Sequence, residues 1–265
     1  IHQAYLHMEM DDESAIMQAI STHKGIFKVK RLMFGVKIAP NIWQRYMDQI
    51  LSNIEGVVCF FDDIAIQGST TSELLNRLQT VLDCLRKNDL HINRNKCKFF
   101  KKSITYLGHT INEEGLHTTT DKVEAITNSP RPTNVSELRT FLGMVNYYQK
   151  FIPNLSAKLH PLHSLLQKES KFIWKKECED SFQKIKSDII STHVLMPFKG
   201  QLSVILATDA SPYGFGAVLS HKLKNGLERP IAFASRPLTK AEKNYSQIDK
   251  EATAIIWGMK KFFQY

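Results

Sequence analysis

The feature that most constrains the fold is a pair of adjacent aspartates enclosed between two short apolar runs. Residues 57–61 (VVCFF) and 64–66 (IAI) flank Asp62 and Asp63 and are rich in β-branched and aromatic side chains. Such runs are typical of short strands, and the acidic pair marks the point where the two strands meet. The sequence therefore predicts a hairpin with two carboxylates at its tip.

Amphipathic helices are expected on both sides of this hairpin. Residues 40–54 have apolar side chains at helical spacing, with Pro40 in the first turn and Gly56 after the end. A second helix begins near Thr70, with Glu73 completing a capping box. Its buried stripe is expected to comprise Leu74, Leu75, Leu78, Val81, Leu82 and Leu85. Helix, hairpin and helix in this order indicate an α+β fold with helices on one face of a sheet.

A turn-rich segment around Pro130 and Pro132 separates these elements from a second group. A strong helix follows, capped by Asn134, and its expected buried face is Leu138, Phe141, Leu142, Val145, Tyr148 and Ile152. A further helix holds Phe182, Ile185 and Ile189. Strand-like runs at residues 204–206, 217–219 and 231–233 then precede a last helix over residues 247–263.

The composition favours a folded protein that binds a polyanion. The chain has 265 residues, of which 43% are apolar, and a formal net charge of +9. Its size allows two domains, and its charge favours nucleic acid modestly over a basic protein with no such partner. The four cysteines form no Cys-x-x-Cys pair, so the sequence does not support a zinc or redox motif. Their scattered positions indicate a reducing compartment. No apolar run reaches 18 residues, so no membrane span is expected.

The acidic pair admits two interpretations. Buried ionised carboxylates are costly unless cations compensate them, and two divalent metals would do so. In two-metal catalysis one ion activates the attacking oxygen and the other stabilises the leaving group, and Mg²⁺ prefers carboxylate oxygen as its ligand. The alternative is an Asp-Asp turn in an ordinary hairpin, which the dipeptide alone favours by roughly two to one.

The neighbouring motifs reverse that preference, because they resemble those of reverse transcriptases of gypsy-type LTR retrotransposons. Residues 60–63 (FFDD) are similar to the family's Tyr-x-Asp-Asp box, and residues 32–44 (LMFGVKIAPNIWQ) to its L-P-F-G-x-x-x-A-P-x-x-F-Q segment. Residues 106–109 (YLGH) resemble its primer-grip turn, and residues 141–148 (FLGMVNYY) its thumb helix. The resemblance runs in order through essentially the whole chain. Phe60 replaces the usual tyrosine and Met33 the usual proline, and neither change removes a metal ligand.

The resemblance implies roles for single residues. Asp62 and Asp63 would be catalytic and would bind Mg²⁺ (or Mn²⁺). Tyr5 would floor the nucleotide pocket and exclude a ribose 2′-OH by its volume, unless it is simply a core tyrosine. Gly35 would let the backbone approach the ligand closely. The other substrate-binding residues would be Phe34, Gln44, Phe60 and Lys96, and the primer grip would be Leu107, Gly108 and His109.

Lys96 has an equally weighted alternative. It belongs to a run of basic residues that are more often a solvated face, namely Arg94, Lys96, Lys98, Lys101 and Lys102.

A second acidic site is implied near the end of the chain. Residues 208–219 (TDASPYGFGAVL) resemble the first strand pair of the family's RNase H domain, and Asp209 lies at the end of its first strand. Glu251 on the last helix matches the second carboxylate, and both residues would be catalytic and metal-binding. The alternative is an exposed Asp and Glu on an α/β domain. Because the family uses further acidic residues downstream, this site is expected to be incomplete before Tyr265.

The resemblance thus implies an α+β fold: a polymerase palm with a remnant of the fingers (1–110), a helical thumb (111–168), a connection (169–200) and the N-terminal part of an RNase H-like α/β domain (201–265). The implied activity is RNA-directed DNA polymerase with RNase H, acting on an RNA and DNA template–primer duplex and dNTPs. The implied setting is a Pol polyprotein with protease and integrase segments, in cytoplasmic virus-like particles.

Two other functions are considered. One is a catalytically inactive remnant that binds only nucleic acid or a protein partner, and the other is a stand-alone ribonuclease, which does not account for residues 1–110.

The chain is also expected to be a fragment, because Ile1 is not an initiator methionine. In the family a third palm aspartate lies five positions before the gate tyrosine, which corresponds to the position directly before Ile1. We therefore expect an Asp encoded there, a fingers region before it, and no detectable DNA synthesis by the isolated chain.

Overall fold

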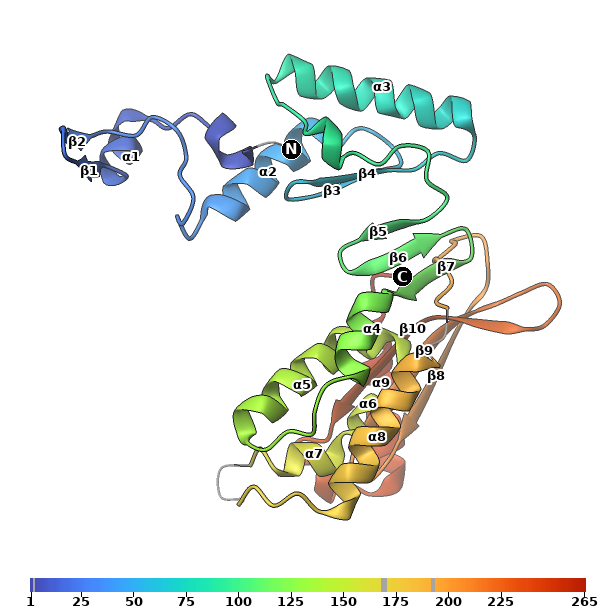
Figure 1. The fold of residues 1–265 in the computed structure, drawn as a ribbon. Helices are drawn as coiled ribbons and strands as arrows, with labels where there is room; N and C mark the ends of the chain where they lie inside the picture. The colour runs from blue at the N-terminus through green and yellow to red at the C-terminus, as the bar shows by residue number, and fades with distance from the viewer. Residues whose placement is uncertain (2, 168–170, 192–193) are drawn as a thin grey trace. The chain divides into compact units, whose positions relative to one another are not determined.

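The computed structural model describes residues 1, 3–167, 171–191 and 194–265, which divide into two compact units, Ile1–Lys101 and Lys102–Tyr265 (Figure 1). Both units combine helices with antiparallel hairpins, as expected for the α+β class. The predicted boundary between thumb and connection, at residues 168 and 169, lies outside the described residues. Among the helices of the described part, none has the length and apolar character needed to cross a membrane.

The first unit consists of short hairpins and two longer helices. Its elements are η1 (Ala4–His7), α1 (Asp12–Met17), β1 (Ile20–Thr22), β2 (Gly25–Phe27), α2 (Ala39–Leu51), β3 (Val57–Phe60), β4 (Asp63–Ile66), α3 (Thr71–Lys87) and η2 (Arg94–Lys96). Strand β1 pairs with β2 and β3 pairs with β4, each pair antiparallel. The hairpin predicted around the acidic pair is therefore confirmed.

The core of this unit lies between α2 and α3. Helix α2 begins with proline in its first turn and buries Trp43, Met47 and Leu51 on one face, as its spacing predicts. These side chains pack in one cluster with Val81 and Leu85 of α3. The predicted end at residue 54 was wrong by one turn, because the helix ends at Leu51.

Helix α3 begins where predicted, with one difference in its cap. The Thr70 side chain accepts a hydrogen bond from the Glu73 backbone N–H at 3.2 Å. The Glu73 carboxylate bonds back to the N–H of Ser69, one residue earlier than a capping box requires. The predicted buried stripe was partly wrong: Val81 and Leu85 are buried, whereas Leu75 is 46% exposed because the core cluster meets α3 in its second half.

The second unit contains a three-stranded meander, a group of helices and a second three-stranded sheet. Its elements are β5 (Ile104–Tyr106), β6 (His109–Asn112), β7 (Gly115–Thr118), α4 (Thr120–Thr127), α5 (Val135–Tyr147), η3 (Gln149–Phe151), α6 (Leu155–Lys158), α7 (His160–Ser164), α8 (Lys176–Ile190), β8 (Val204–Ala210), β9 (Gly214–Lys222), β10 (Glu228–Pro237), η4 (Glu242–Asn244) and α9 (Gln247–Lys261). All four elements predicted after residue 200 are confirmed.

A large apolar cluster packs helices α4 to α8 of this unit together. It contains every residue of the predicted α5 face and of the predicted α8 face, namely Leu138, Phe141, Leu142, Val145, Tyr148, Ile152, Phe182, Ile185 and Ile189. Phe233 of β10 packs against the same cluster, so the helices and the second sheet are parts of one packed body.

The second sheet has the strand order β10-β9-β8 and is covered on both faces. Neighbouring residues of a strand face opposite sides, and on β9 Ala217 faces α9 whereas Gly216 faces Asn154, which precedes α6. A side chain at Gly216 would collide with the Asn154 amide, and one at Gly258 of α9 would approach Thr208 to 2.8 Å. Glycine thus allows close packing on each face of the sheet.

Candidate active sites

The acidic pair lies at the tip of the β3–β4 hairpin. Phe60 pairs with Asp63 in the antiparallel register, so Phe61 and Asp62 are the turn residues. Phe61 has a left-handed backbone conformation with φ of 49°, which is uncommon for a large side chain. Both Asp62 and Asp63 are exposed. The expectation that burial makes this pair costly was therefore wrong, because the turn presents both carboxylates to solvent.

Two side chains of α2 form hydrogen bonds to the backbone of this turn. The Trp43 indole N–H donates to the carbonyl oxygen of Phe61 at 3.0 Å, and the Phe61 N–H donates to the Gln44 side-chain oxygen at 2.7 Å. The Gln44 amide also donates to the carbonyl oxygen of Cys59 at 3.1 Å. Sequence reasoning missed these bonds: it placed Trp43 only on an apolar face and assigned Gln44 to the substrate.

Cys59 is not a reactive thiol in this setting. It lies half-buried on the inner face of β3, and burial raises the pKa of its thiol to about 11. The neutral thiol contacts the carbonyl oxygen of Phe61 at 3.5 Å. Nucleophilic chemistry by Cys59 is therefore disfavoured at neutral pH.

The residues predicted to form the nucleotide pocket lie in one aromatic series. The ring of Tyr5, in η1, has its centroid 5.3 Å from that of Phe34 and 6.5 Å from that of Trp43. Phe34 is 61% exposed, so its ring is available to a ligand. Trp43 in turn bonds to the turn at Phe61. The structure thus brings Tyr5 and Phe34 into one connected group with the acidic turn.

Three other residues predicted to bind substrate differ in their contacts with neighbouring residues. Gly35 has a φ of 90°, so glycine is needed there for backbone conformation, and a Cβ would meet no atom within 4 Å. The Phe60 ring is 44% exposed and lies 4.4 Å from the Phe61 ring. Lys96 is exposed in η2, and within the described residues its side chain has neither a hydrogen bond nor an ion pair. Its role near a triphosphate stays a prediction.

The predicted primer grip is the tight turn between β5 and β6. Leu107 and Gly108 have φ values of 47° and 66°, the left-handed pair typical of a two-residue hairpin turn. The hydroxyl of Tyr147 donates to the carbonyl oxygen of Leu107, and that of Tyr148 donates to the carbonyl oxygen of Gly108 at 3.0 Å. Both tyrosines belong to the thumb-helix motif at residues 141–148, but the motif did not indicate that they bond to the turn at Leu107 and Gly108.

His109, the residue after this turn, is enclosed by aromatic rings. It stacks on Tyr147 with ring centroids 5.2 Å apart and contacts Tyr148 and Phe151 edge-on or tilted. Burial and the nearby Lys150 lower the pKa of His109 to about 4, and its Nδ1 atom has no hydrogen-bond partner among the described residues. The imidazole is therefore neutral at physiological pH and acts as an aromatic packing group.

The predicted RNase H carboxylates lie on neighbouring elements. Asp209 is exposed near the end of β8, and Glu251 is half-buried in the first turns of α9. Gln247 connects the two elements, because its amide donates to the carbonyl oxygen of Ala210 at 2.9 Å and to the Glu251 carboxylate at 2.7 Å. Sequence reasoning did not single out Gln247. Its position one helical turn before Glu251 was the only sign of this link.

Both acidic sites supply donors that suit a divalent cation. Mg²⁺ is usually bound through one or two carboxylates together with waters and substrate phosphates, which is the set that Asp62 and Asp63 offer. Across residues 1, 3–167, 171–191 and 194–265, no cluster of three or more His, Cys, Asp or Glu side chains could hold a metal. The Asp62 and Asp63 carboxylates match the one or two protein ligands that Mg²⁺ usually takes.

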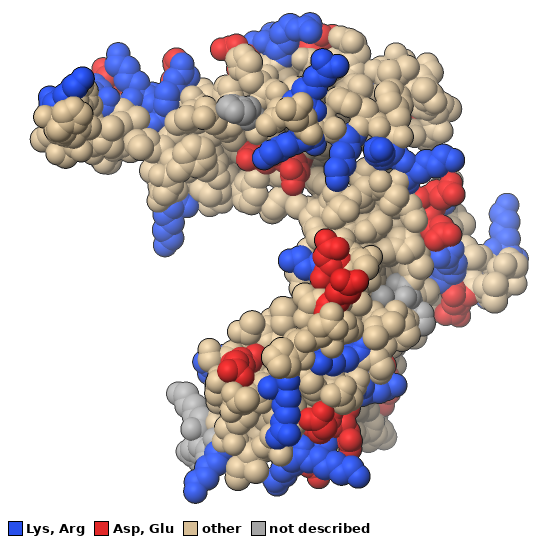
Figure 2. All heavy atoms as spheres, in the orientation of Figure 1, with Lys and Arg blue, Asp and Glu red and all other residues tan. Residues whose placement is uncertain are grey.

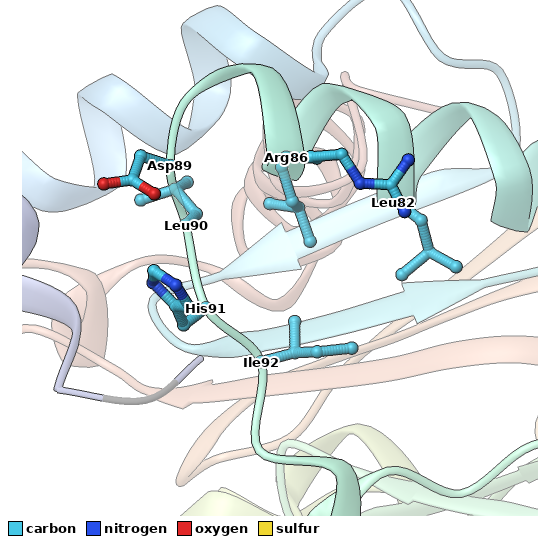
Figure 3. Close-up of a pocket in the computed structure, with 7 residues that line it drawn as sticks. Leu82, Arg86, Asp89, Leu90, His91 and Ile92 are labelled. Atoms are coloured by element: carbon cyan, nitrogen blue, oxygen red, sulfur yellow. The ribbon is translucent and has the colours of Figure 1, made fainter.

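A pocket of about 360 Å³ on the first unit contains none of the predicted site residues (Figure 3). It is lined by Leu82, Leu85 and Arg86 of α3 and by residues 89–92, which follow that helix. The candidate nucleotide site is instead the open surface around Tyr5, Phe34 and the acidic turn.

Positive charge is dispersed over the face of the molecule that Figure 2 draws. On the face drawn in Figure 2, Lys and Arg are interspersed with Asp and Glu over much of the surface. The net charge of +9 therefore favours a polyanion through many separated contacts.

Comparison with protein families matches two parts of the chain. Residues 1–111 match the family described as reverse transcriptase (RNA-dependent DNA polymerase). Residues 174–265 match the RNase H-like domain found in reverse transcriptase. The acidic turn lies in the first match, and Asp209 and Glu251 lie in the second.

Curated relatives match almost the whole chain. The chain is 40% identical over 261 residues to the retrovirus-related Pol polyprotein from transposon 297 of Drosophila melanogaster, covering 97% of this chain and 24% of the relative. It is 35% identical over 244 residues to the transposon Tf2-7 polyprotein of Schizosaccharomyces pombe, covering 91% of this chain and 18% of the relative. The chain thus spans a quarter or less of the length of these relatives.

Solved structures confirm the fold class. The foamy viral protease-reverse transcriptase in complex with dsDNA has a TM-score of 0.88 at 23% identity, covering 100% of this chain and 55% of that chain. The same type of protein in complex with an RNA/DNA hybrid has a TM-score of 0.85 at 23% identity, covering 99% of this chain and 36% of that chain. At this identity the likeness shows the fold alone.

Proposed function

Because the chain belongs to the reverse transcriptase and RNase H region of retrotransposon Pol polyproteins, we propose that the whole protein is an RNA-directed DNA polymerase with RNase H activity. The observation that carries the proposal is the exposed Asp62-Asp63 turn, connected through Trp43 to the Tyr5–Phe34 pair. Carboxylates beside an exposed aromatic surface suit a nucleotide whose base and sugar stack while its phosphates meet cations. We assign the retrotransposon that encodes this chain to the gypsy type because of its sequence motifs.

In this proposal the first unit positions a dNTP and a primer terminus. The primer 3′-hydroxyl releases its proton to water as its oxygen forms a bond to the α-phosphorus. The bond from that phosphorus to the oxygen bridging the α- and β-phosphates breaks, and pyrophosphate leaves. Asp62 and Asp63 would hold Mg²⁺ or Mn²⁺, which would neutralise phosphate charge and lower the pKa of the attacking hydroxyl. Tyr5 would limit the volume beside the sugar C2′, and Phe34, Gly35 and Phe60 would shape the remaining pocket.

The other parts of the proposal concern the second unit and the partners. Leu107, Gly108 and His109 would contact the primer, residues 111–168 would act as the thumb, residues 169–200 as the connection and residues 201–265 as part of the RNase H domain. Asp209 and Glu251 would cleave the RNA strand of a hybrid with bound divalent metal. The partners would be a template–primer duplex, dNTPs, and protease and integrase segments of one polyprotein, in cytoplasmic virus-like particles.

Measuring both activities in the parent protein tests this function. We expect the parent to extend a DNA primer on an RNA template and to cleave the RNA of a labelled hybrid, each only with Mg²⁺ or Mn²⁺. Asp209→Asn and Glu251→Gln should abolish cleavage and leave primer extension intact. A folded parent that binds template–primer but has neither activity would contradict the proposal and support the remnant.

A further inference from the structure

Gln44 uses every hydrogen of its side-chain amide inside the protein. The amide nitrogen donates to a carboxylate oxygen of Asp48 at 2.7 Å and to the carbonyl oxygen of Cys59 at 3.1 Å. The amide oxygen accepts from the Phe61 N–H at 2.7 Å. A glutamine amide has only two donor hydrogens, so Gln44 has none left for a nucleotide.

Asp48 reinforces the direction in which this amide faces. A carboxylate only accepts hydrogen bonds, so the Gln44 nitrogen points toward Asp48, one helical turn later on α2, and toward the Cys59 carbonyl oxygen. The amide oxygen then faces the N–H of Phe61. A rotation by 180° would place the amide oxygen against two acceptors and an amide donor against the Phe61 N–H, which is also a donor. The Asp48 carboxylate therefore adds to the preference for the orientation that bonds to the turn.

The bonded group is the residue whose conformation shapes the tip of the hairpin. Phe61 is left-handed, with φ of 49°, and such a conformation costs an L residue roughly 1–2 kcal/mol. Gln44 holds its N–H, and the fully buried Trp43 holds its carbonyl oxygen. With both backbone groups of Phe61 fixed, the chain can leave the turn toward Asp62 and Asp63 in one direction only.

We propose that Gln44 and Asp48 are positioning residues that set the orientation of the Asp62 and Asp63 carboxylates, and that Gln44 does not contact the nucleotide. The inference rests on the proposed polymerase function for its catalytic consequence. It differs from the expectation that Gln44 binds substrate, because both amide hydrogens are already donated to partners within the first unit and the amide oxygen accepts from the Phe61 N–H.

Three variants of the parent protein separate positioning from substrate binding. Gln44→Glu removes both donors and places a second carboxylate beside Asp48. We expect kcat for primer extension to fall roughly 100-fold, the loss that misplacement by about 1 Å produces, while KM for dNTP changes less than about threefold. The Mg²⁺ concentration for half-maximal activity should rise. Asp48→Asn should lower kcat by roughly tenfold, since it weakens the preference for one amide orientation.

The double variant Gln44→Glu with Asp48→Asn provides a rescue. The amide introduced at position 48 would donate to one oxygen of the carboxylate introduced at position 44. The other oxygen of that carboxylate could still accept from the Phe61 N–H, so only the bond to Cys59 is lost. We expect kcat of the double variant to exceed that of Gln44→Glu alone by roughly tenfold, as coupled neighbours do. A double variant no better than Gln44→Glu would overturn the role of Asp48.

A readout that needs no activity is the Trp43 indole N–H. The chain has three tryptophans, so ¹⁵N-tryptophan labelling can resolve the indole signals of this region. Because this N–H bonds to Phe61, its chemical shift should change in Gln44→Glu, and the Phe61 amide should exchange with solvent faster. Both changes should occur in a folded protein with or without Mg²⁺.

A matched control lies on the exposed face of α3. There Gln79 donates to Asp83 at 2.9 Å with the same spacing of one helical turn, so Gln79→Glu and Asp83→Asn repeat the chemistry away from the turn. These variants should keep kcat and the Trp43 signal.

Two results would overturn the inference. One is a Gln44→Glu variant with normal kcat and a dNTP KM raised more than tenfold, which would make Gln44 a substrate contact. The other is an unchanged Trp43 signal and Phe61 exchange rate. A parent without DNA synthesis would instead contradict the proposed function. The indole and exchange measurements would still decide whether Gln44 and Asp48 fix the Phe61 turn.

Discussion

Two residues with left-handed backbone conformations, Phe61 and Leu107, lie in the two turns that the proposed polymerase uses. Each is held by side chains from a helix distant in sequence: Gln44 and Trp43 bond to Phe61, and Tyr147 bonds to Leu107. Such bonds offset the cost of a conformation that most L residues avoid. The exposed groups beside each turn are thereby held in place before a ligand binds.

The first prediction at this scale concerns Tyr5. Its ring packs on Phe34 and Trp43, so Tyr5→Ala should open space beside the sugar without moving the acidic turn. We expect the ratio of ribonucleotide to deoxyribonucleotide incorporation by the parent to rise at least about tenfold, because a bulky group discriminates by volume. Tyr5→Phe, which keeps the ring, is the control and should retain the parental ratio. An unchanged ratio in Tyr5→Ala would exclude the gate role.

His109 gives a prediction for pH. Its pKa in the folded protein is lowered to about 4 from the ordinary 6.5, mainly by burial, so the folded state favours the neutral ring. As pH falls below 6.5 the unfolded chain takes up this proton first, and stability is lost progressively toward pH 4. Between about pH 7 and pH 5 the loss should be about 1 kcal/mol, after allowance for solvent screening.

Replacing His109 by phenylalanine keeps the stacking on Tyr147 and removes the titrating group. In thermal melts, the Tm of the His109→Phe variant should therefore fall less on acidification than the Tm of the unsubstituted parent. His23, which is exposed between β1 and β2, is the control, and His23→Phe should leave the fall unchanged. The same acid sensitivity in His109→Phe and the parent would contradict this account.

At the scale of elements, periodicity predicted what depends on local pattern. The α5 face and the α8 face were foreseen because 3.6-residue spacing places their apolar residues on one side. The stripe of α3 was overestimated, because its spacing does not show how far a neighbouring element extends along the helix. The side-chain bonds to the turns were not foreseen, since Gln44 and Phe61 are 17 residues apart and Tyr147 and Leu107 are 40 residues apart.

The turn between β5 and β6 supplies the prediction at this scale. Gly108 has φ of 66°, and a Cβ there would lie 2.8 Å from the Tyr147 hydroxyl. Gly108→Ala should therefore lower the free energy of unfolding by about 2 kcal/mol, and primer binding should weaken with it. Adding Tyr147→Phe should relieve the contact, but it also removes the hydrogen bond to the Leu107 carbonyl oxygen and leaves the backbone strain, so the double variant should recover little of the loss.

The control for this substitution is Gly143 in α5. A Cβ there meets no atom within 4 Å, and alanine in a helix is more stable than glycine by about 0.5–1 kcal/mol. In urea unfolding of the parent variants, the free energy of unfolding should thus fall for Gly108→Ala and rise for Gly143→Ala. Equal effects would mean that the turn is not fixed as described.

At the scale of the whole molecule, each of the two compact units contains one acidic site. The first holds Asp62 and Asp63, and the second holds Asp209 and Glu251. The motifs identified these four residues, because they lie in long ordered patterns, but the sequence alone could not show that Asp62 and Asp63 are exposed. It also gave no indication that Gln247 bonds to Glu251 and to the end of β8.

The dispersed positive charge yields a prediction about binding. With a net charge of +9, the affinity of the parent for template–primer should fall steeply with salt, since bound cationic side chains displace counterions from phosphates. We expect a loss of at least about tenfold between roughly 50 and 200 mM salt in equilibrium titrations. A flat dependence would argue for a partner other than nucleic acid.

The most direct test of the central claim is primer extension on an RNA template by the parent protein and its Asp62→Asn and Asp63→Asn variants. The amide keeps the shape of each side chain and removes the charge that would hold a cation, so both variants should remain folded and make no detectable DNA. Asp89→Asn is the control, because Asp89 is exposed and left-handed, a conformation that asparagine adopts readily. It should extend the primer as the parent does. Extension by Asp62→Asn or Asp63→Asn at the parental rate would contradict the assignment of this turn as the polymerase active site.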